Sequence, residues 1–213
     1  MTNVSTKIGL ISDVHATAGP VEEAFTIFQR QGVDRVFCGG DIAGYGTELG
    51  QTVDLLVGNG CETVMGNHDL WYLNYPSETQ DEPVVAFFEK LPLSLQVSFE
   101  GKRLYLVHAS PPQSLKEGIT LLDENAQLLV DRKTRWTEEL VGSECDVLIV
   151  GHTHQVFCEQ LGNVLVVNPG STKFNHTCAV LSLPQLDVEI YPLSNKKPLR
   201  AWNWSMLGDE LGA

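Results

Sequence analysis

Short apolar runs alternate with segments of helical periodicity in the first third of the chain. Three runs rich in β-branched and aliphatic residues predict buried strands, at 7–12 (KIGLIS), 34–40 (DRVFCGG) and 61–66 (CETVMG). Between them, apolar residues recur at helical spacing over 21–31, and 48–60 predicts a second helix that ends near Gly58 or Gly60. These strand–helix repeats indicate an α/β fold.

The pattern changes after residue 92 and predicts a second sheet. Residues 93–108 are typical of a hairpin that turns at 100–102, and 119–141 has the periodicity of a helix. Three further segments predict one strand and then two pairs of strands around Gly or Pro turns, at 145–150, 155–170 and 176–193. No element is predicted for the tail at 195–213.

Size and charge limit the kinds of partner that the chain can have. It has 213 residues, of which 43% are hydrophobic, and this favours a single domain over residues 1–213 with one sizeable core. Its 27 acidic and 14 basic residues give a formal charge of -13. A surface this acidic repels the phosphate backbone of nucleic acids, so we expect no polymeric DNA or RNA partner.

The cysteines and the lack of long apolar segments bear on location. Five cysteines, an odd number without C-x-x-C spacing, favour reduced thiols, and we expect them to be buried as small hydrophobic side chains. No segment approaches the ~18 apolar residues of a membrane span, and the N-terminus has no signal-peptide pattern. The sequence therefore predicts a soluble, cytoplasmic protein with no membrane partner.

Polar side chains follow five of the predicted strands at the point where each strand ends. They are Asp13 and His15, then Asp41, then Asn67, His68 and Asp69, then His108, and finally His152 and His154. The intervals from Asp13 to Asp41 and from Asp41 to Asn67 are 28 and 26 residues, close to the ~30 residues of one βαβ unit. Because ligands bind beyond the carboxyl ends of strands in open α/β sheets, we expect these side chains to converge.

The donor types in this set predict a metal site. Carboxylate and amide oxygens together with imidazole nitrogens, and no cysteine, suit a hard or borderline divalent metal. Residues i and i+2 of an extended D-x-H or H-x-H segment point the same way. Asp13 and His15, or His152 and His154, can on this argument serve one centre together.

The ordered set D-x-H, G-D, G-N-H-D, a later His and G-H-x-H spans residues 13 to 154 and resembles the calcineurin-like metallophosphoesterases. The resemblance implies a four-layer αββα sandwich of two mixed β-sheets flanked by helices. It also implies two metal sites that share Asp41 as a bridge: the first consists of Asp13, His15, Asp41 and His154, and the second of Asp41, Asn67, His108 and His152.

The resemblance further implies a two-metal phosphoesterase that hydrolyses small phosphodiesters or phosphomonoesters. Two cations ~3.5–4 Å apart bind both reacting oxygens of a phosphoryl group and lower the pKa of a bound water. Mn²⁺ is the expected metal, and Fe, Zn and Ni also fit such donors, since O/N sites select by geometry and availability. Small relatives often self-associate, so a homo-oligomer is left open.

His68 is the expected catalytic residue that is not a metal ligand. By resemblance it lies beside the scissile phosphate, where it stabilises the developing charge or protonates the leaving oxygen. Phosphoprotein phosphatases read G-D-x-x-D-R-G, with an Asp that orients this histidine and an Arg that grips phosphate. Here Gly44 and Tyr45 occupy those two positions, which argues against a protein phosphatase and leaves open what orients His68.

The chain is most similar to the small bacterial and archaeal phosphodiesterase branch, which shares GD-x-x-G-Y-G and N-P-G-S, here 168–171. That branch often has an Arg soon after N-P-G-S, whereas this chain has TKFNHT. We expect Tyr45 and His176 near the substrate, the alternative for each being a packing role. Other functions kept open are a non-catalytic scaffold, as in the retromer subunit of this family, and a dinucleoside-polyphosphate hydrolase.

Overall fold

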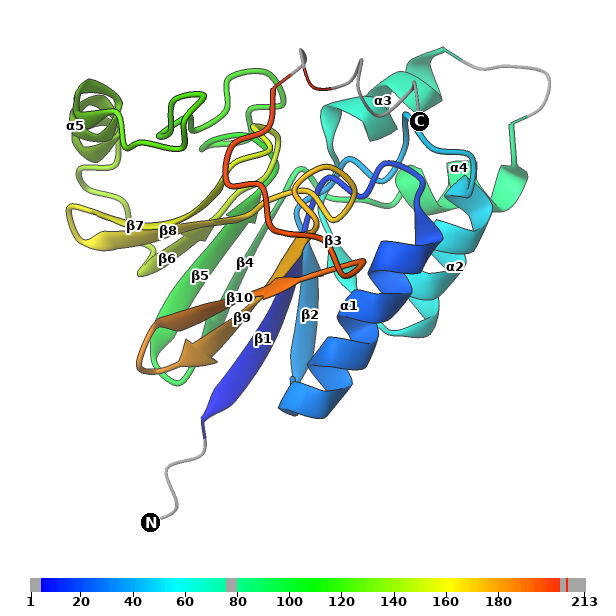
Figure 1. The fold of residues 1–213 in the computed structure, drawn as a ribbon, viewed down its shortest axis with the longest axis horizontal. Coiled ribbons are helices and arrows are strands. Elements are labelled where there is room, and N and C mark those ends of the chain that lie inside the picture. The colour runs from blue at the N-terminus through cyan, green and yellow to red at the C-terminus, as the bar shows by residue number, and fades with distance from the viewer. Residues whose placement is uncertain (1–4, 76–79, 204–205, 207–213) are drawn as a thin grey trace.

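The computed structural model describes residues 5–75, 80–203 and 206, and its core is two five-stranded mixed sheets packed face to face (Figure 1). The first sheet has the order β10-β9-β1-β2-β3, with β1 (Thr6–Ile11), β2 (Arg35–Cys38), β3 (Glu62–Thr63), β9 (Thr177–Leu183) and β10 (Asp187–Pro192). The second has the order β4-β5-β6-β8-β7, with β4 (Ser94–Phe99), β5 (Lys102–Val107), β6 (Val147–Ile149), β7 (Val156–Leu161) and β8 (Val164–Pro169).

Alternation along the central strands places one set of side chains between the sheets and the other under the helices. In β1, Ile8 and Leu10 join the apolar cluster between the two sheets, whereas Ile11 joins the cluster on the helical side. Gly9 also faces the helices, and a Cβ at this position would lie 2.8 Å from the ring of Phe28. The missing side chain therefore lets the first helix pack directly on the strand.

Helices form the two outer layers. On the first sheet, α1 (Ala18–Gln31) and α2 (Leu49–Gly58) pack with α4 (Glu82–Phe88), and α5 (Val130–Glu139) covers the second sheet on the other side of the molecule. The remaining helix, α3 (Asn67–Asn74), lies beside α4 (Figure 1). The structure confirms the α/β class and the αββα sandwich.

Several local expectations need correction. The helix expected over 119–141 is only α5, because Gln155 holds the preceding segment in a loop: its side chain accepts the N–H groups of Leu121 and Leu122 and donates to the Leu122 carbonyl. The strand expected at 61–66 shrinks to β3, and α3 and α4 were not expected at all. The apolar spacing predicted too long a helix because it does not show that the Gln155 side chain satisfies the backbone hydrogen bonds of the preceding loop.

Two other expectations concern the cysteines and the membrane. All five cysteines are free thiols, but Cys158 is exposed on β7 and only Cys38 and Cys178 are fully buried. Within the described residues, no helix has both the length and the apolar character needed to cross a bilayer.

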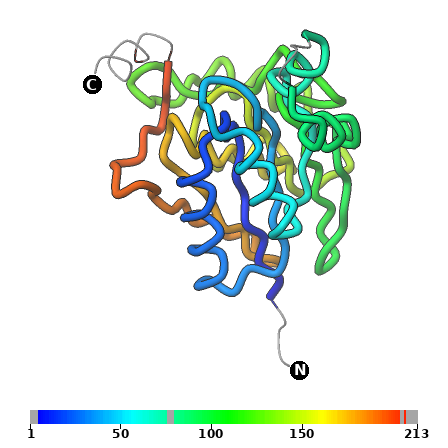
Figure 2. Tube along the Cα trace, turned by 90° about the vertical axis from the view of Figure 1, so that its right-hand side faces the viewer, coloured from blue at the N-terminus to red at the C-terminus, as the bar shows by residue number. Residues whose placement is uncertain are grey.

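The loops that carry the predicted ligands lie at one end of the sandwich, opposite to the start of β1 (Figures 1 and 2). Backbone hydrogen bonds join them: the Asp13 N–H donates to the Gly40 carbonyl, and the Gly151 N–H donates to the His108 carbonyl. The second bond links the loops after β5 and β6, and the first links those after β1 and β2. The His152 N–H donates to the Asp13 carboxylate and joins the loops of the two sheets at a common edge.

Candidate metal centre

The ligand-bearing segments are loops with left-handed backbone rather than extended strand ends. Positive φ angles occur at five of the seven predicted ligands: Asp13, His15, Asp41, His152 and His154. L-residues adopt this region at a steric cost, and such residues concentrate at functional sites. The alternation argument therefore fails here, and the rings of His152 and His154 face different groups.

Three predicted ligands form an enclosed group, which we call the inner half. The Nε2 atoms of His15 and His154 are 3.1 Å apart, and His154 Nε2 lies 3.4 Å from Asp13 Oδ1. All three side chains are buried, and one ligand atom of each lies within 4.8 Å of the others. Aromatic rings surround them: Phe174 stacks on His154 at 5.1 Å, and Trp202 stacks on Phe174 at 4.4 Å.

Asn67, His108 and His152 form a second group, which we call the outer half. Asn67 Oδ1 lies 3.1 Å from His108 Nε2 and 2.9 Å from His152 Nδ1. Asp41 lies beside both halves, and its Oδ1 is 3.4 Å from His108 Nε2. One of its oxygens lies within 4.8 Å of ligand atoms of His108 and His152, and one lies within the same distance of His15 and His68. The structure thus brings all seven predicted ligands together and divides the two histidines of H-x-H between the halves.

Backbone carbonyls set the orientation of three imidazoles. His15 Nδ1 lies 3.0 Å from the Ala43 carbonyl oxygen, His108 Nδ1 2.7 Å from that of Gly39, and His152 Nε2 3.1 Å from that of Lys116. A carbonyl only accepts, so each of these nitrogens must carry the proton of its hydrogen bond. In the neutral ring the other nitrogen then faces the cluster with a free lone pair, which is the arrangement found in metal-binding histidines.

The buried carboxylates of the cluster favour positive charge beside them. Burial alone would raise the pKa of Asp13 and Asp41, but interactions with His154 at Asp13 and with His108 at Asp41 outweigh burial and lower both. Burial lowers the pKa of His15 to about 4, whereas His108, despite its burial, is raised to about 9 by the charge of Asp41. Without a metal, a proton on His108 supplies the positive charge. Metal binding should displace that proton.

The donor set fits a pair of divalent cations. Oxygen and nitrogen ligands without sulfur suit Mn²⁺ and similar ions, and nitrogens 3.1 Å apart can both reach one ion at the ~2.0–2.2 Å of a metal–nitrogen bond. The arrangement of the histidines and carboxylates is therefore compatible with a dinuclear metal centre.

Asp69 supports the loop that carries Asp41. Its Oδ1 accepts the N–H groups of Ile42 and Ala43, and its Oδ2 accepts those of Asp41 and Gly66. Asp69 is fully buried, and burial together with the charge of Asp41 raises its pKa to about 7. It therefore fixes the loop after β2 to the start of α3 through the backbone. This carboxylate is committed to the loop rather than to His68.

Aromatic rings surround the His68 imidazole. Its ring centroid lies 4.7 Å from that of Trp71, 4.9 Å from that of Tyr45 and 5.1 Å from that of His15. Gly44 has φ +91°, and a Cβ there would lie 2.7 Å from His68 Nδ1. Gly44 occupies the position of the orienting Asp of phosphoprotein phosphatases, so in this chain backbone atoms rather than a carboxylate lie against the His68 ring. Burial lowers the pKa of His68 below its usual range, so the ring is mainly uncharged at neutral pH.

The N-P-G-S segment contributes more than a strand-ending turn. Asn168 Nδ2 donates to the Gly151 carbonyl, and Ser171 Oγ donates to that of Asp13, so the segment holds both ligand loops. Asn175 adds a hydrogen bond from Nδ2 to the His154 carbonyl. In the sequence, only the position of these residues at and after the end of a predicted strand could have indicated that they hold the ligand loops.

A cavity of about 640 Å³ opens beside the ligand cluster and borders residues of both halves. Its lining residues are Asp41, Tyr45, Asn67, His68, Trp71, Lys116, Gly118, Thr120, His152, Thr153, His154, Gln155, Trp202 and Asn203. Tyr45 thus borders the site as expected. His176 is buried in the turn before β9 and is not among these lining residues. Lys116, Trp202 and Asn203 were missed, since loop residues and the tail give no periodic signal.

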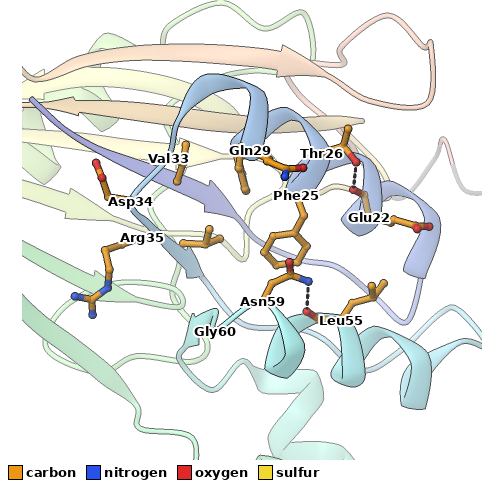
Figure 3. A pocket seen from close by; sticks show the side chains of 12 residues that line it. Glu22, Phe25, Thr26, Gln29, Val33, Asp34, Arg35, Leu55, Asn59 and Gly60 are labelled. Atoms are coloured by element: carbon orange, nitrogen blue, oxygen red, sulfur yellow. Dashed lines mark hydrogen bonds between the residues drawn. The ribbon is translucent and has the colours of Figure 1, made fainter.

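A second hollow of about 550 Å³ lies between α1, α2 and β2, away from the ligand loops (Figure 3). Its lining mixes the aromatic ring of Phe25 with polar groups such as Asn59, whose amide donates to the Leu55 carbonyl. The charged side chain of Arg35 pairs with Glu62. The two hollows are similar in volume, and only the one beside the ligand cluster is a candidate active site.

The fold and the donor cluster define the class: an αββα protein with a candidate dinuclear metal centre at the carboxyl edge of its strands. A sequence model of the calcineurin-like phosphoesterase superfamily domain matches residues 6–188. The chain belongs to the calcineurin-like phosphoesterase superfamily.

Individual relatives are more distant. The protein of Methanocaldococcus jannaschii named Uncharacterized protein MJ0912 is 28% identical over 124 residues, 51% of this chain and 51% of that protein, so the match spans about half of each. The structure of hypothetical protein PH1004 from Pyrococcus horikoshii is similar with a TM-score of 0.71 and 14% identity, covering 97% of this chain and 92% of that one. A metallophosphoesterase from Sphaerobacter thermophilus has a TM-score of 0.69 and 20% identity over 90% of both chains. At these identities the structures share the fold.

Proposed function

We propose that this chain is a two-metal-dependent hydrolase of small phosphodiesters or phosphomonoesters. The observation that carries the proposal is the convergence of seven donor side chains, from four loops and the start of α3, beside a cavity. One cation would be held by Asp13, His15, Asp41 and His154, and a second by Asp41, Asn67, His108 and His152. Mn²⁺ is the expected metal, with Fe, Zn and Ni as alternatives. When bound, the two cations polarise the phosphoryl group and lower the pKa of a bound water.

The chain's own residues orient the substrate and assist the leaving group. The uncharged His68 ring borders the cavity and is suited to donate an N–H hydrogen bond to the leaving oxygen. Lys116 is the one Lys or Arg side chain among the residues described as lining the cavity. It offers the positive charge that an Arg at position 45 would otherwise supply. Tyr45 lies on the wall of the cavity beside His68.

The alternative functions are less well supported. A non-catalytic scaffold does not need a complete donor set, and this chain has one in which four imidazoles face two carboxylates. Phosphoprotein phosphatase activity lacks support because Gly44 and Tyr45 replace the Asp that orients the histidine and the Arg that binds phosphate in those enzymes. A dinucleoside-polyphosphate hydrolase would use the same chemistry, and comparing hydrolysis of a dinucleoside tetraphosphate with that of bis-p-nitrophenyl phosphate tests it. A small phosphoester substrate, a cytoplasmic location and the absence of a polymeric nucleic-acid partner remain predictions.

Hydrolysis of bis-p-nitrophenyl phosphate by the purified protein tests the proposal. We expect turnover with added Mn²⁺ and its loss on treatment with a chelator. His68→Ala should retain both metals but lower kcat on a diester with a poor leaving group by ~10²–10⁴-fold, because it removes a group that acts on the leaving oxygen. Metal content and kcat must be measured on the same preparations.

Two outcomes would contradict the proposal. Turnover at an unchanged rate in the presence of chelator would exclude the metal-dependent chemistry. Loss of metal from His68→Ala would show that His68 is a ligand, and full activity of that variant on a diester with a poor leaving group would remove its catalytic role.

A further inference from the structure

Trp71 lies one helical turn after His68 on α3 and faces the same cavity. The two ring centroids are 4.7 Å apart and the ring planes meet at 60°, so this tilted contact covers only part of the indole. Trp71 remains 51% exposed, in contrast to Trp136 and Trp202, which are 3% and 7% exposed. Trp71 is therefore a large aromatic side chain that the fold leaves half uncovered at the cavity.

The position of this ring relative to His68 indicates which part of a substrate it would meet. In the proposed function, His68 acts on the leaving oxygen, so the group bonded to that oxygen lies next to the imidazole. Two partly exposed rings contact His68 at the cavity: Trp71, 51% exposed, and Tyr45, 42% exposed. A planar leaving group would cover aromatic surface that is otherwise in contact with water.

We propose that the leaving group of the substrate is a nucleoside whose base stacks on Trp71. This inference rests on the proposed function. A cavity of about 640 Å³ is within the ~300–1,000 Å³ range of small-molecule sites and has room for a nucleotide. Thr120 lines the same cavity and has a hydroxyl group that can hydrogen-bond to the polar edge of a base.

Binding of non-hydrolysable ligands tests this inference independently of turnover. The probes are the phosphonate analogues of AMP and of ribose 5-phosphate, in which a methylene group replaces the 5′ oxygen. Titration calorimetry with the Mn²⁺-loaded protein should give on the order of 10-fold tighter binding for the AMP analogue, because one base–aromatic stack is worth about that much. Equal binding of the two analogues by the wild-type protein would overturn the inference.

Variants of α3 identify the residue responsible. Trp71→Ala should remove the preference for the AMP analogue, and Trp71→Phe should keep part of it. Tyr75→Ala is the matched control, since Tyr75 is an aromatic residue 78% exposed at the end of the same helix and outside the cavity lining; it should retain the full preference. If Trp71 served only to hold His68, Trp71→Ala would lower kcat on bis-p-nitrophenyl phosphate and leave the binding ratio unchanged.

A third probe separates a nucleobase from any aromatic ring. Benzylphosphonate presents a phosphonate and a phenyl ring without the polar edge of a base. It should bind less tightly than the AMP analogue, and binding of equal strength would overturn the assignment of a nucleoside. Failure of these binding tests with intact hydrolysis of bis-p-nitrophenyl phosphate would refute this inference alone, whereas absent hydrolysis would refute the proposed function.

Discussion

The inner and outer halves of the ligand cluster use similar donors in different surroundings. The inner-half residues Asp13, His15 and His154 are buried, and the ring of Phe174 packs against the rings of His15 and His154. Of the histidine ligands that border the cavity, His154 is nearly buried and His152 is only partly buried. Water and substrate therefore reach the outer half more readily. We infer that the inner half contributes more to metal retention and the outer half more to contact with the substrate.

Asp41 belongs to both halves, and its removal should give the largest effect. Asp41→Ala takes a ligand from each cation and leaves two positive charges less well screened from each other. We expect both metals to be lost after dialysis, and kcat on bis-p-nitrophenyl phosphate to fall on the order of 10³-fold or more, since metal catalysis contributes several kcal/mol. Elemental analysis of the dialysed protein checks this. Retention of both metals would remove Asp41 as the bridge.

Matched histidine substitutions test the contrast between the halves. Both side chains line the cavity, but His154 is 6% exposed and packs against the rings of Phe174 and Trp202, whereas His152 is only partly buried, so water can replace its ring more readily. We expect His154→Ala to lose one metal that excess Mn²⁺ does not restore, and His152→Ala to regain two at high Mn²⁺. Metal titrations of both variants measure this, and identical titration curves would break the comparison.

Asp69 fixes the loop of the shared ligand Asp41 to the start of α3, and Asp69→Asn should have an intermediate effect. The amide would place an NH₂ group against two of the four backbone N–H donors that the carboxylate now accepts. We expect ~10–100-fold weaker metal binding and a loss of about 2–4 kcal/mol in the free energy of unfolding of the metal-free protein. Metal titration and urea denaturation measure the two.

Asp123→Asn provides the control for Asp69→Asn. Asp123 Oδ1 accepts the N–H groups of Asn125 and Gln127 in an exposed turn, and the amide oxygen of Asn can take over both. This control should lose less than about 1 kcal/mol. Equal losses for the two variants would show that the four hydrogen bonds of Asp69 have no special part in holding the site.

Lys116 should give the smallest effect, confined to substrate binding at the outer half. Lys116→Met keeps the backbone carbonyl that His152 contacts but removes the charge. We expect KM to rise about 5-fold with kcat nearly unchanged, since an exposed charge contributes ~1 kcal/mol, and the difference should shrink with added salt. Lys90→Met, an exposed lysine outside the cavity lining, is the control. A fall in kcat without a change in KM would assign Lys116 another role.

The identity of the ligand types could be predicted from the sequence, but the geometry of the site could not. Asp13, Asp41 and Asn67 recur at the interval of one strand–helix repeat, and this regularity alone predicts that they meet. The argument from strand alternation nevertheless grouped His152 with His154. It fails because alternation applies to extended strands, whereas these residues have φ angles of +67° and +48°. Likewise the helix predicted over 119–141 was too long, since periodicity cannot register the hydrogen bonds of Gln155.

The sequence by itself determined the α/β class and the polar side chains at the strand ends, because hydrophobic period and strand-end position are local properties of the chain. The resemblance to a known family added the αββα sandwich and the set of seven predicted ligands. Tertiary structure alone decided what surrounds these donors: backbone rather than a carboxylate against His68, Asp69 committed to the Asp41 loop, and Trp202 from the tail packed against His154. Such contacts join residues far apart in sequence through side-chain shape and hydrogen-bond geometry. They exist only once both sheets have brought their loops to one edge.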